Sequence, residues 1–190
     1  MVKKTVFYGG QFNPIHIAHA LVASEVYHQI QPDTFYFMPS YMSPLKQHDS
    51  MISHVHRVRM IAHTIDMLGF GRLYLEEIER KGQSYTIDTM RAYQLKHPDE
   101  QLYFVIGTDQ YEQLHRWQDI EVLKEIVTFI VVNRGTTQQH VDETMVSITI
   151  PRMDISSTQI RERIQTGQNI KALVPRNVER YILEECLYEN

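Results

Sequence analysis

The chain has 190 residues, of which 43% are hydrophobic and 22% charged, with a formal net charge of −4 at pH 7. These values are typical of a soluble globular protein, and they exclude a disordered chain or one that binds nucleic acid through its overall charge. No stretch approaches about 18 consecutive apolar residues, so we expect no membrane partner. The single cysteine cannot form an internal disulfide and no secretory signal is evident, so we expect a cytoplasmic protein.

Short apolar runs rich in β-branched and aromatic residues alternate with segments of helical spacing. The runs predict strands at Thr5–Tyr8, Thr34–Met38, Arg72–Leu75, Gln101–Ile106, Thr128–Val132 and Met145–Ile150. The helical patterns cover Ile17–Ile30, Ser53–Leu68, Thr86–Lys96, Ser157–Gln165 and Arg176–Leu187. Because alternating strands and helices need crossover connections, we expect residues 1–190 to form one doubly wound, Rossmann-like α/β domain. It should have a mostly parallel sheet of five or slightly more strands and a helical C-terminal cap.

The connection between the first predicted strand and helix reads GGQFNPIHIAH, residues 9–19. Open parallel sheets bind ligands beyond the carboxyl ends of their strands, which is where this connection lies. Gly9 and Gly10 let the backbone approach a ligand closely, and the helix start offers N–H groups and a positive dipole end to an anion. His16 and His19 share one helix face and can both donate to phosphate oxygens. The segment is therefore either a phosphate site or a structural turn.

Three other kinds of site do not match the sequence. The glycines do not follow the G-x-G-x-x-G dinucleotide fingerprint, and the chain has no G-x-x-x-x-G-K-[ST] phosphate loop. A zinc protease helix needs histidines four apart with glutamate beside the first, whereas His16 and His19 are three apart and Ile17 follows the first. We therefore expect no metal ion held by protein ligands.

The segment GGQFNPIHIAH resembles the G-x-F-x-P-x-H-x-G-H signature of the nucleotidyltransferase superfamily, with Ala18 in place of the last glycine. A second segment, ISSTQIR at residues 155–161, is similar to the superfamily motif I-S-S-T-x-[IVL]-R. From the residues alone, Ser156 and Gln159 predict a capping box at a helix start. The resemblance implies that this helix start binds the β- and γ-phosphates of ATP.

Further motifs, in order along essentially the whole chain, resemble the bacterial nicotinate mononucleotide adenylyltransferases, a family of that superfamily. They are SPLK at 43–46, SYTIDTM at 84–90, IGTDQY at 106–111 and the lone Trp117. The resemblance implies that ATP and nicotinate mononucleotide are the substrates. The products would be nicotinate adenine dinucleotide and pyrophosphate, a step of NAD biosynthesis, and Mg²⁺ would be bound through the substrate phosphates.

The resemblance also implies roles for individual residues. Catalysis by positioning and charge neutralisation falls to His16, His19, Lys46 and Arg161. The residues expected to bind ATP are Gly9, Gly10, Phe12, His16, His19, Gly107, Asp109, Ile155, Ser156, Ser157, Thr158 and Arg161. Those expected to bind the mononucleotide are Lys46, Tyr85, Thr86, Asp109, Trp117 and Arg134. Trp117 would stack on the pyridine ring, with Tyr85 and Thr86 near its carboxylate.

Each role has a plain structural alternative. Lys46 can be a solvated loop lysine and Asp109 a helix cap, while Trp117 can be a core residue and Arg134 an exposed loop arginine. The polar stretch Ser40–Ser50 predicts a mobile loop that orders when substrates bind.

Two alternative functions remain open. One is a nucleotidyltransferase acting on phosphopantetheine or a sugar-alcohol phosphate, and the other is a nucleotide-binding sensor without turnover. The chain can be a monomer or a homodimer.

Overall fold

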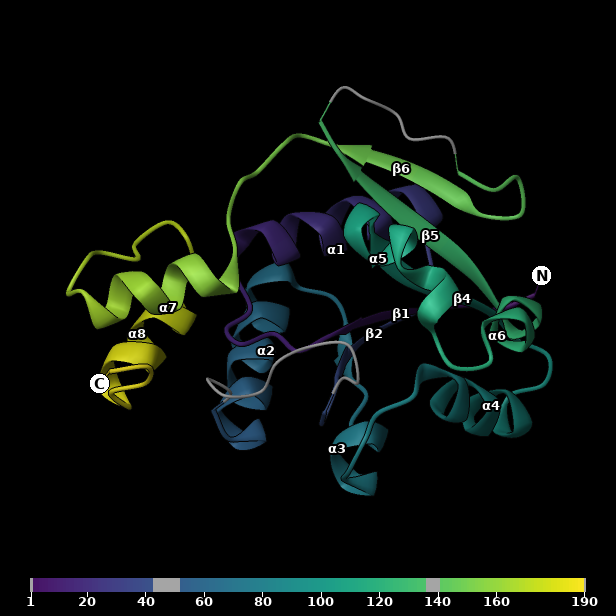
Figure 1. Cartoon of the computed structure of the whole chain (residues 1–190), viewed down its shortest axis with the longest axis horizontal. Coiled ribbons are helices and arrows are strands. Elements are labelled where there is room, and N and C mark those ends of the chain that lie inside the picture. Colours follow the sequence, from purple (N-terminus) through teal and green to yellow (C-terminus); the bar gives the residue numbers. More distant parts are fainter. Residues whose placement is uncertain (1, 43–51, 136–140, 190) are drawn as a thin grey trace.

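The computed structural model describes residues 2–42, 52–135 and 141–189. In these residues six strands form one parallel sheet in the order β3-β2-β1-β4-β5-β6 (Figure 1). The strands are β1 (Lys4–Gly10), β2 (Thr34–Pro39), β3 (Arg72–Leu73), β4 (Gln101–Gly107), β5 (Val127–Arg134) and β6 (Val146–Ile150). The strand order reverses between β1 and β4, and sheets of this kind bind ligands at such a reversal.

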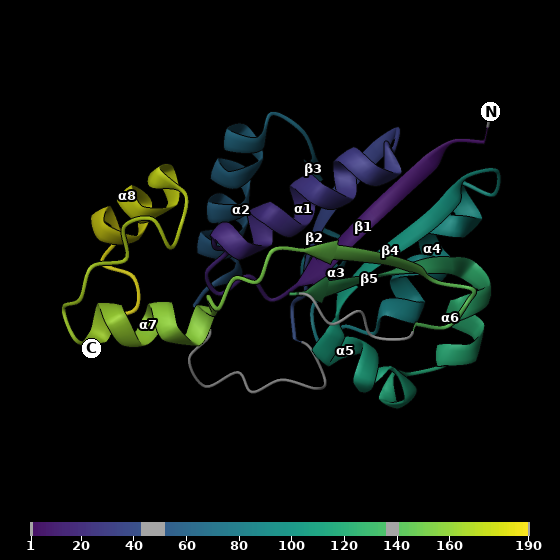
Figure 2. The same cartoon turned by 90° about the horizontal axis from the view of Figure 1, so that it is seen from above.

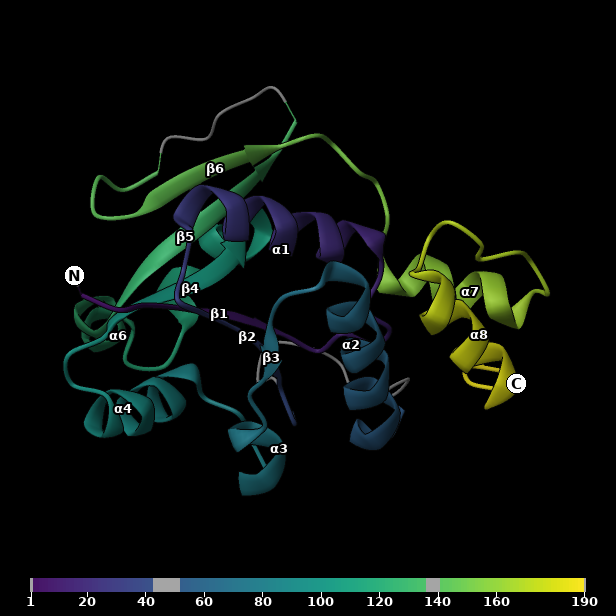
Figure 3. The same cartoon turned by 180° about the vertical axis from the view of Figure 1, so that it is seen from behind.

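Helices cover both faces of the sheet. They are α1 (Ile17–Ile30), α2 (His54–Leu68), α3 (Glu76–Arg80), α4 (Thr86–Lys96), α5 (Thr108–Glu112), α6 (Ile120–Ile126), α7 (Ser157–Gln165) and α8 (Arg176–Glu184), with a short 3-10 helix η1 (Leu114–Arg116). Helices α1 and α2 lie on one face, and α4 and α6 on the other (Figure 2). Helices α7 and α8 lie beyond the end of the sheet, with α8 packed on α2 (Figure 3). None of the helices in the described residues has the length and apolar character that crossing a membrane requires.

The strands carry apolar side chains on both faces, and two buried clusters result. Val6 and Tyr8 belong to the cluster under α1 and α2, whereas Phe7 between them belongs to the cluster under α4 and α6. The ring of Phe7 meets that of Tyr93 on α4 edge-on, with centroids 4.9 Å apart. Because both faces are covered there, the central strands such as β1 and β4 are nearly continuous apolar runs, which is why the sequence predicts them.

The predicted doubly wound α/β architecture is confirmed, with six parallel strands in the part of the chain that the structure describes. The helices predicted at Ile17–Ile30, Thr86–Lys96 and Ser157–Gln165 have these bounds in the structure. The predicted helix start at residue 53 is the N-cap of α2, whose first helical residue is 54. Local patterns were therefore sufficient for most of the regular elements.

The main differences concern short or terminal elements. β3 ends at Leu73 rather than Leu75, because Leu75 is the N-cap of α3. α8 ends at Glu184 rather than residue 187, where Cys186 takes a left-handed conformation with φ of 47°. Helices α3, α5 and α6 were not predicted, since five to seven residues are too few to establish a helical period.

Candidate active site

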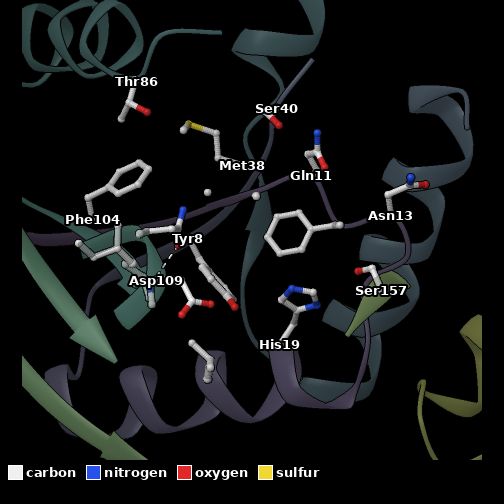
Figure 4. Close-up of a pocket in the computed structure, with 18 of the residues that line it drawn as sticks. Tyr8, Gln11, Asn13, His19, Met38, Ser40, Thr86, Phe104, Asp109 and Ser157 are labelled. Atoms are coloured by element: carbon white, nitrogen blue, oxygen red, sulfur yellow. Dashed lines mark hydrogen bonds between the residues drawn. The ribbon is translucent and has the colours of Figure 1, made fainter. Parts of the chain in front are cut away.

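A cleft of about 1100 Å³ lies at the carboxyl ends of β1 and β4, the position predicted from the topology. Its volume is slightly above the usual range of about 300–1,000 Å³ for small-molecule sites. The predicted site residues that line it are Gly9, Gly10, Phe12, His16, His19, Tyr85, Thr86, Gly107, Asp109, Trp117, Ile155, Ser156, Ser157, Thr158 and Arg161. Segments far apart in the sequence therefore meet in one place, as Figure 4 shows for some of them.

Two predicted residues are not placed by their side chains. Lys46 lies outside the described residues, as does most of the Ser40–Ser50 stretch that was predicted to be a mobile loop. Arg134 is the last residue of β5 and pairs with Ile150 of β6, but its side chain is outside the described part of the chain. Their roles remain predictions.

The glycines of the cleft serve two different purposes. Gly9 and Gly10 are the last residues of β1 rather than part of a loop, and neither has a positive φ. A Cβ atom on Gly9 would lie 2.7 Å from Cζ of Phe104, and one on Gly10 would lie 3.0 Å from Cζ of Phe12. Both glycines thus make room for aromatic rings. A Cβ atom on Gly107 would meet no heavy atom of the described residues within 4 Å, so this glycine leaves the cleft open for a ligand.

The paired histidines lie together, as predicted. His16 is the N-cap of α1 and His19 lies in the first turn, with ring centroids 3.7 Å apart. The backbone N–H of His16 donates to Nδ1 of His19 at 3.2 Å. Because Nδ1 of His19 accepts this bond, the proton of the neutral ring is on Nε2, which makes Nε2 a hydrogen-bond donor. Phe12 holds the His19 ring from the side, with centroids 5.2 Å apart.

The start of α1 is less open than the sequence suggested. Its first N–H group, that of Ile17, donates to the carbonyl of Leu173 at 3.0 Å. The prediction that this helix start offers its N–H groups to an anion is therefore wrong for Ile17, because a segment between α7 and α8 packs against it. Ala18, which replaces the signature glycine, is only 2% exposed, and its methyl group is buried in the core.

The start of α7 completes the same wall of the cleft. Ser156 caps the helix by accepting from the backbone N–H three residues later at 3.2 Å, the bond expected from the serine of the predicted capping box. The hydroxyl of Ser157 donates to the carbonyl of Pro14 at 2.9 Å, and Arg161 donates to the carbonyl of Asn13 at 2.8 Å. The two motifs that the sequence singled out are therefore joined directly.

The opposite wall is largely apolar. Met38 and Phe104 lie there with Thr86, across the cleft from His19 and Ser157 (Figure 4). Trp117 is half-buried and meets Phe104 edge-on, with centroids 5.9 Å apart. It is thus both a core contact and part of the cleft wall.

Polar groups of Thr86, Tyr85 and Asp109 also line the cleft. Thr86 is the first residue of α4, so its hydroxyl and the helix start can both interact with a carboxylate. Tyr85, the N-cap of α4, donates its hydroxyl proton to Gln83 at 3.0 Å. Asp109 is exposed in the first turn of α5 and can accept hydrogen bonds from ribose hydroxyls. The wall therefore combines an apolar surface with a few directional groups.

A buried carboxylate supports the Thr86 side of the cleft. Glu77 is 3% exposed and accepts from the hydroxyl of Thr89 at 3.2 Å. Burial raises the pKa of Glu77, although hydrogen bonds from Ser84 and Thr89 oppose this shift. The hydroxyl of Ser84 in turn accepts from the backbone N–H of Tyr41 at 3.0 Å. This network ties the end of β2 to the start of α4.

A buried arginine supports the other side. Arg57 on α2 is 1% exposed and donates to the carbonyls of Gln11 and Ser40 at 2.7 and 2.8 Å. Burial lowers the pKa of its guanidinium, and the nearby phenol of Tyr188 opposes this shift. Sequence reasoning missed Arg57, since an arginine among helical apolar positions looks like a solvent-facing residue.

Other missed residues are Asn13, Met38, Glu77 and Phe104, which all line the cleft. Phe104 could have been found, because it lies on β4, a predicted strand that borders the reversal point. Met38 lies near the end of β2, which is separated from that point by β1. Glu77 lies on a helix that was not predicted. In the described part of the chain no group of three or more His, Cys, Asp or Glu side chains is placed to hold a metal ion.

The fold, the paired histidines and the α7 motif together point to the nucleotidyltransferases. Residues 7–163 match the model of the cytidylyltransferase-like family, so the chain belongs to that family, and the predicted nucleotidyltransferase relationship is confirmed.

Solved structures share this fold. A Vibrio parahaemolyticus protein assigned as a nicotinate-nucleotide adenylyltransferase is similar with a TM-score of 0.73 and 20% identity, over 98% of this chain and 95% of that one. Plasmodium falciparum nicotinic acid mononucleotide adenylyltransferase is similar in two structures, one complexed with NaAD and one with APC. Each has a TM-score of 0.78 and 21% identity, over 98% of this chain and 97% of the other.

Proposed function

We propose that the protein transfers the adenylyl group of ATP to nicotinate mononucleotide, forming nicotinate adenine dinucleotide and pyrophosphate. The observation that carries the proposal is the pairing of two walls in one cleft. The two nucleotidyltransferase motifs form one wall, and an aromatic wall with the Thr86 hydroxyl faces them (Figure 4). The Plasmodium falciparum structures complexed with NaAD and with APC add support, since they share the fold.

The reaction suits the residues of the first wall. The phosphate of the mononucleotide attacks the α-phosphorus of ATP, and the bond from that phosphorus to the bridging oxygen of pyrophosphate breaks. The attacking phosphate is already ionised, so no general base is needed, and catalysis depends on positioning and charge neutralisation. His16, His19 and Arg161 are the donors for the developing charge, and Lys46 is proposed to join them.

We propose that Mg²⁺ enters with the triphosphate. The cleft of the described residues contains the carboxylates of Asp109 and Glu77 but no cluster of ligands, and Mg²⁺ in such sites is held largely by substrate phosphates and water. When bound, the ion neutralises charge on the departing pyrophosphate.

The second wall is proposed to select the mononucleotide. Trp117 stacks on the pyridine ring, and Thr86 with the start of α4 donates hydrogen bonds to the ring's carboxylate. Tyr85 lies beside this carboxylate, Asp109 accepts from a ribose hydroxyl, and Arg134 contacts the mononucleotide phosphate.

The test is a panel of nucleotides and acceptors on the purified full chain. ATP and CTP are each mixed with nicotinate mononucleotide, nicotinamide mononucleotide, phosphopantetheine and glycerol 3-phosphate, and pyrophosphate and product mass are measured. We expect rapid turnover only with ATP and nicotinate mononucleotide. Turnover with phosphopantetheine or glycerol 3-phosphate would instead make the protein another nucleotidyltransferase, and nucleotide binding without any turnover would make it a sensor.

A further inference from the structure

We propose that Tyr188 is a positioning residue for the loop of residues 11–14, here called the motif loop, and fixes it for transition-state binding. The proposal rests on the proposed function, in which His16, which follows the motif loop closely, and Arg161, which donates to it, are donors to the reacting phosphates. No sequence motif includes Tyr188, which acts through Asn13 rather than on a substrate.

Tyr188 reaches the motif loop from a distant part of the sequence. Its hydroxyl donates to Oδ1 of Asn13 at 2.9 Å, across 175 positions of the chain. The backbone turns back after α8, where Leu187 N–H donates to the carbonyl of Ile182 at 3.0 Å and Tyr188 takes a left-handed φ of 67°. Both partners are buried, Tyr188 at 9% exposure and Asn13 at 5%. A residue held in this costly conformation is retained only where its surroundings require it.

The bond is one of several that hold the motif loop from outside. The carbonyls of Gln11, Asn13 and Pro14 accept from side chains on α2 and α7, as described above. Tyr188 adds the contact to the side chain of Asn13, so this residue is held at both its backbone and its side chain. The same residue that anchors Arg161 is therefore oriented by Tyr188.

The phenol is suited to this task. Burial raises the pKa of Tyr188, although Arg161 and Arg57 nearby oppose the shift, so the hydroxyl keeps its proton and remains a donor. A phenylalanine would preserve the ring and its packing but remove the donor. We expect the Asn13 side chain, and with it the backbone that receives Arg161, to lose its fixed orientation.

The consequence should appear in the chemical step with ATP. The free energy of one buried hydrogen bond corresponds to about a tenfold change in an equilibrium constant. If the correct loop conformation is lost to that extent, kcat/KM for ATP in Tyr188→Phe should fall about tenfold. The preference between nicotinate and nicotinamide mononucleotides should not change, because Tyr188 does not line the cleft wall that contains Thr86.

A matched control lies in the same part of the chain. The hydroxyl of Tyr181 on α8 lies 2.9 Å from Nδ1 of His56 on α2, a bond that does not involve the motif loop. Tyr181→Phe thus also removes one tyrosine hydroxyl that lies 2.9 Å from its hydrogen-bond partner. It should leave the kinetics and the motif loop unchanged.

The experiment measures amide hydrogen exchange of residues 11–19 without substrate, together with kcat, KM for ATP and thermal unfolding. We expect exchange in the motif loop to be about tenfold faster in Tyr188→Phe than in Tyr181→Phe or the wild type. Equal exchange and equal kinetics in the two variants would overturn the proposal. Because exchange needs no acceptor, faster exchange in a protein that uses a different substrate would overturn only the proposed function.

Asn13→Ala tests the same bond from the other partner, and it decides the matter if Tyr188→Phe does not fold. Loop exchange in Asn13→Ala should be faster to a similar extent. Where both single variants fold, their combination should be no worse than either, because they remove one shared interaction. Unchanged exchange in Asn13→Ala, or effects that simply add, would contradict a direct positioning role.

Discussion

The two walls of the cleft are held in place in different ways. The wall with His16 and His19 is fixed by hydrogen bonds from distant segments, such as those of Ser157 and Arg161 to the motif loop. The surface of the facing wall is formed largely by packed rings, as in the contact of Trp117 with Phe104, and hydrogen bonds such as that from Thr89 to Glu77 lie behind it. Hydrogen bonds set distance and angle, whereas packed rings fix shape and exclude water. We infer that the first wall serves the chemical step and the second selects the substrate.

Replacing a histidine of the first wall should have the largest effect. His19→Ala should lower kcat by about two to three powers of ten, the usual loss when one preorganised donor is removed. Its selectivity between the two mononucleotides should stay the same. His28→Ala is the control, because His28 is exposed on the same helix. The test is steady-state kinetics together with a check of thermal unfolding. Near-normal turnover in His19→Ala would show that His19 does not bind the reacting phosphates.

The glycines at the ends of β1 and β4 separate packing from ligand access. Gly9→Ala should lower the free energy of unfolding by about 1–3 kcal/mol, because its methyl group would overlap the buried ring of Phe104. Gly107→Ala should change it by less than about 0.5 kcal/mol but raise KM for ATP, since its methyl group would occupy open space in the cleft. Urea unfolding and kinetics on both variants test this. A loss of stability in Gly107→Ala, with a raised KM but normal stability in Gly9→Ala, would contradict these two roles.

Thr86→Val should sharpen the role of the second wall. The variant loses the hydroxyl that is proposed to donate to the pyridine carboxylate, so the preference for nicotinate over nicotinamide mononucleotide should shrink about tenfold. Trp117→Ala should weaken both substrates together, because both pyridine rings stack alike. The measurement is kcat/KM for both mononucleotides. If Thr86→Val kept the same preference for nicotinate mononucleotide, the main chain at the start of α4, and not the Thr86 hydroxyl, would make the contact with the carboxylate.

The smallest effect concerns Glu77 behind the second wall. Its pKa is raised by burial, so the folded state favours the protonated form. Its contribution to stability is fully present below the pKa of the unfolded chain and is lost as the pH rises through the folded-state pKa. The free energy of unfolding of Glu77→Gln, relative to wild type, should therefore increase from acidic to neutral pH. Urea titrations across that range measure the difference, and parallel curves would show that Glu77 titrates normally.

Much of the fold could be predicted because its signals are local. Central strands such as β4 are continuous apolar runs, and the serine that caps α7 follows a known N-cap pattern. The short helices α3, α5 and α6 could not be predicted in the same way. They span five to seven residues, and tertiary packing rather than periodicity stabilises them.

The site was predicted where its residues belong to motifs and missed where it depends on long-range contacts. His16, His19 and Arg161 follow recognisable spacings. The purpose of Gly9 could not be seen, because it depends on a ring 95 positions later. Arg57 and Tyr188 carry no local signal either, since each acts through a contact with the motif loop that only the folded chain creates.

The most direct test of the proposed function is the wild-type preference between the two mononucleotides with ATP as the donor. In the proposed site a carboxylate would gain charge-assisted hydrogen bonds from Thr86 and the start of α4, whereas a carboxamide would place an NH₂ group against those donors. We expect kcat/KM to be at least about tenfold higher for nicotinate mononucleotide than for nicotinamide mononucleotide. Equal values for the two substrates would contradict the carboxylate site and the nicotinate assignment with it.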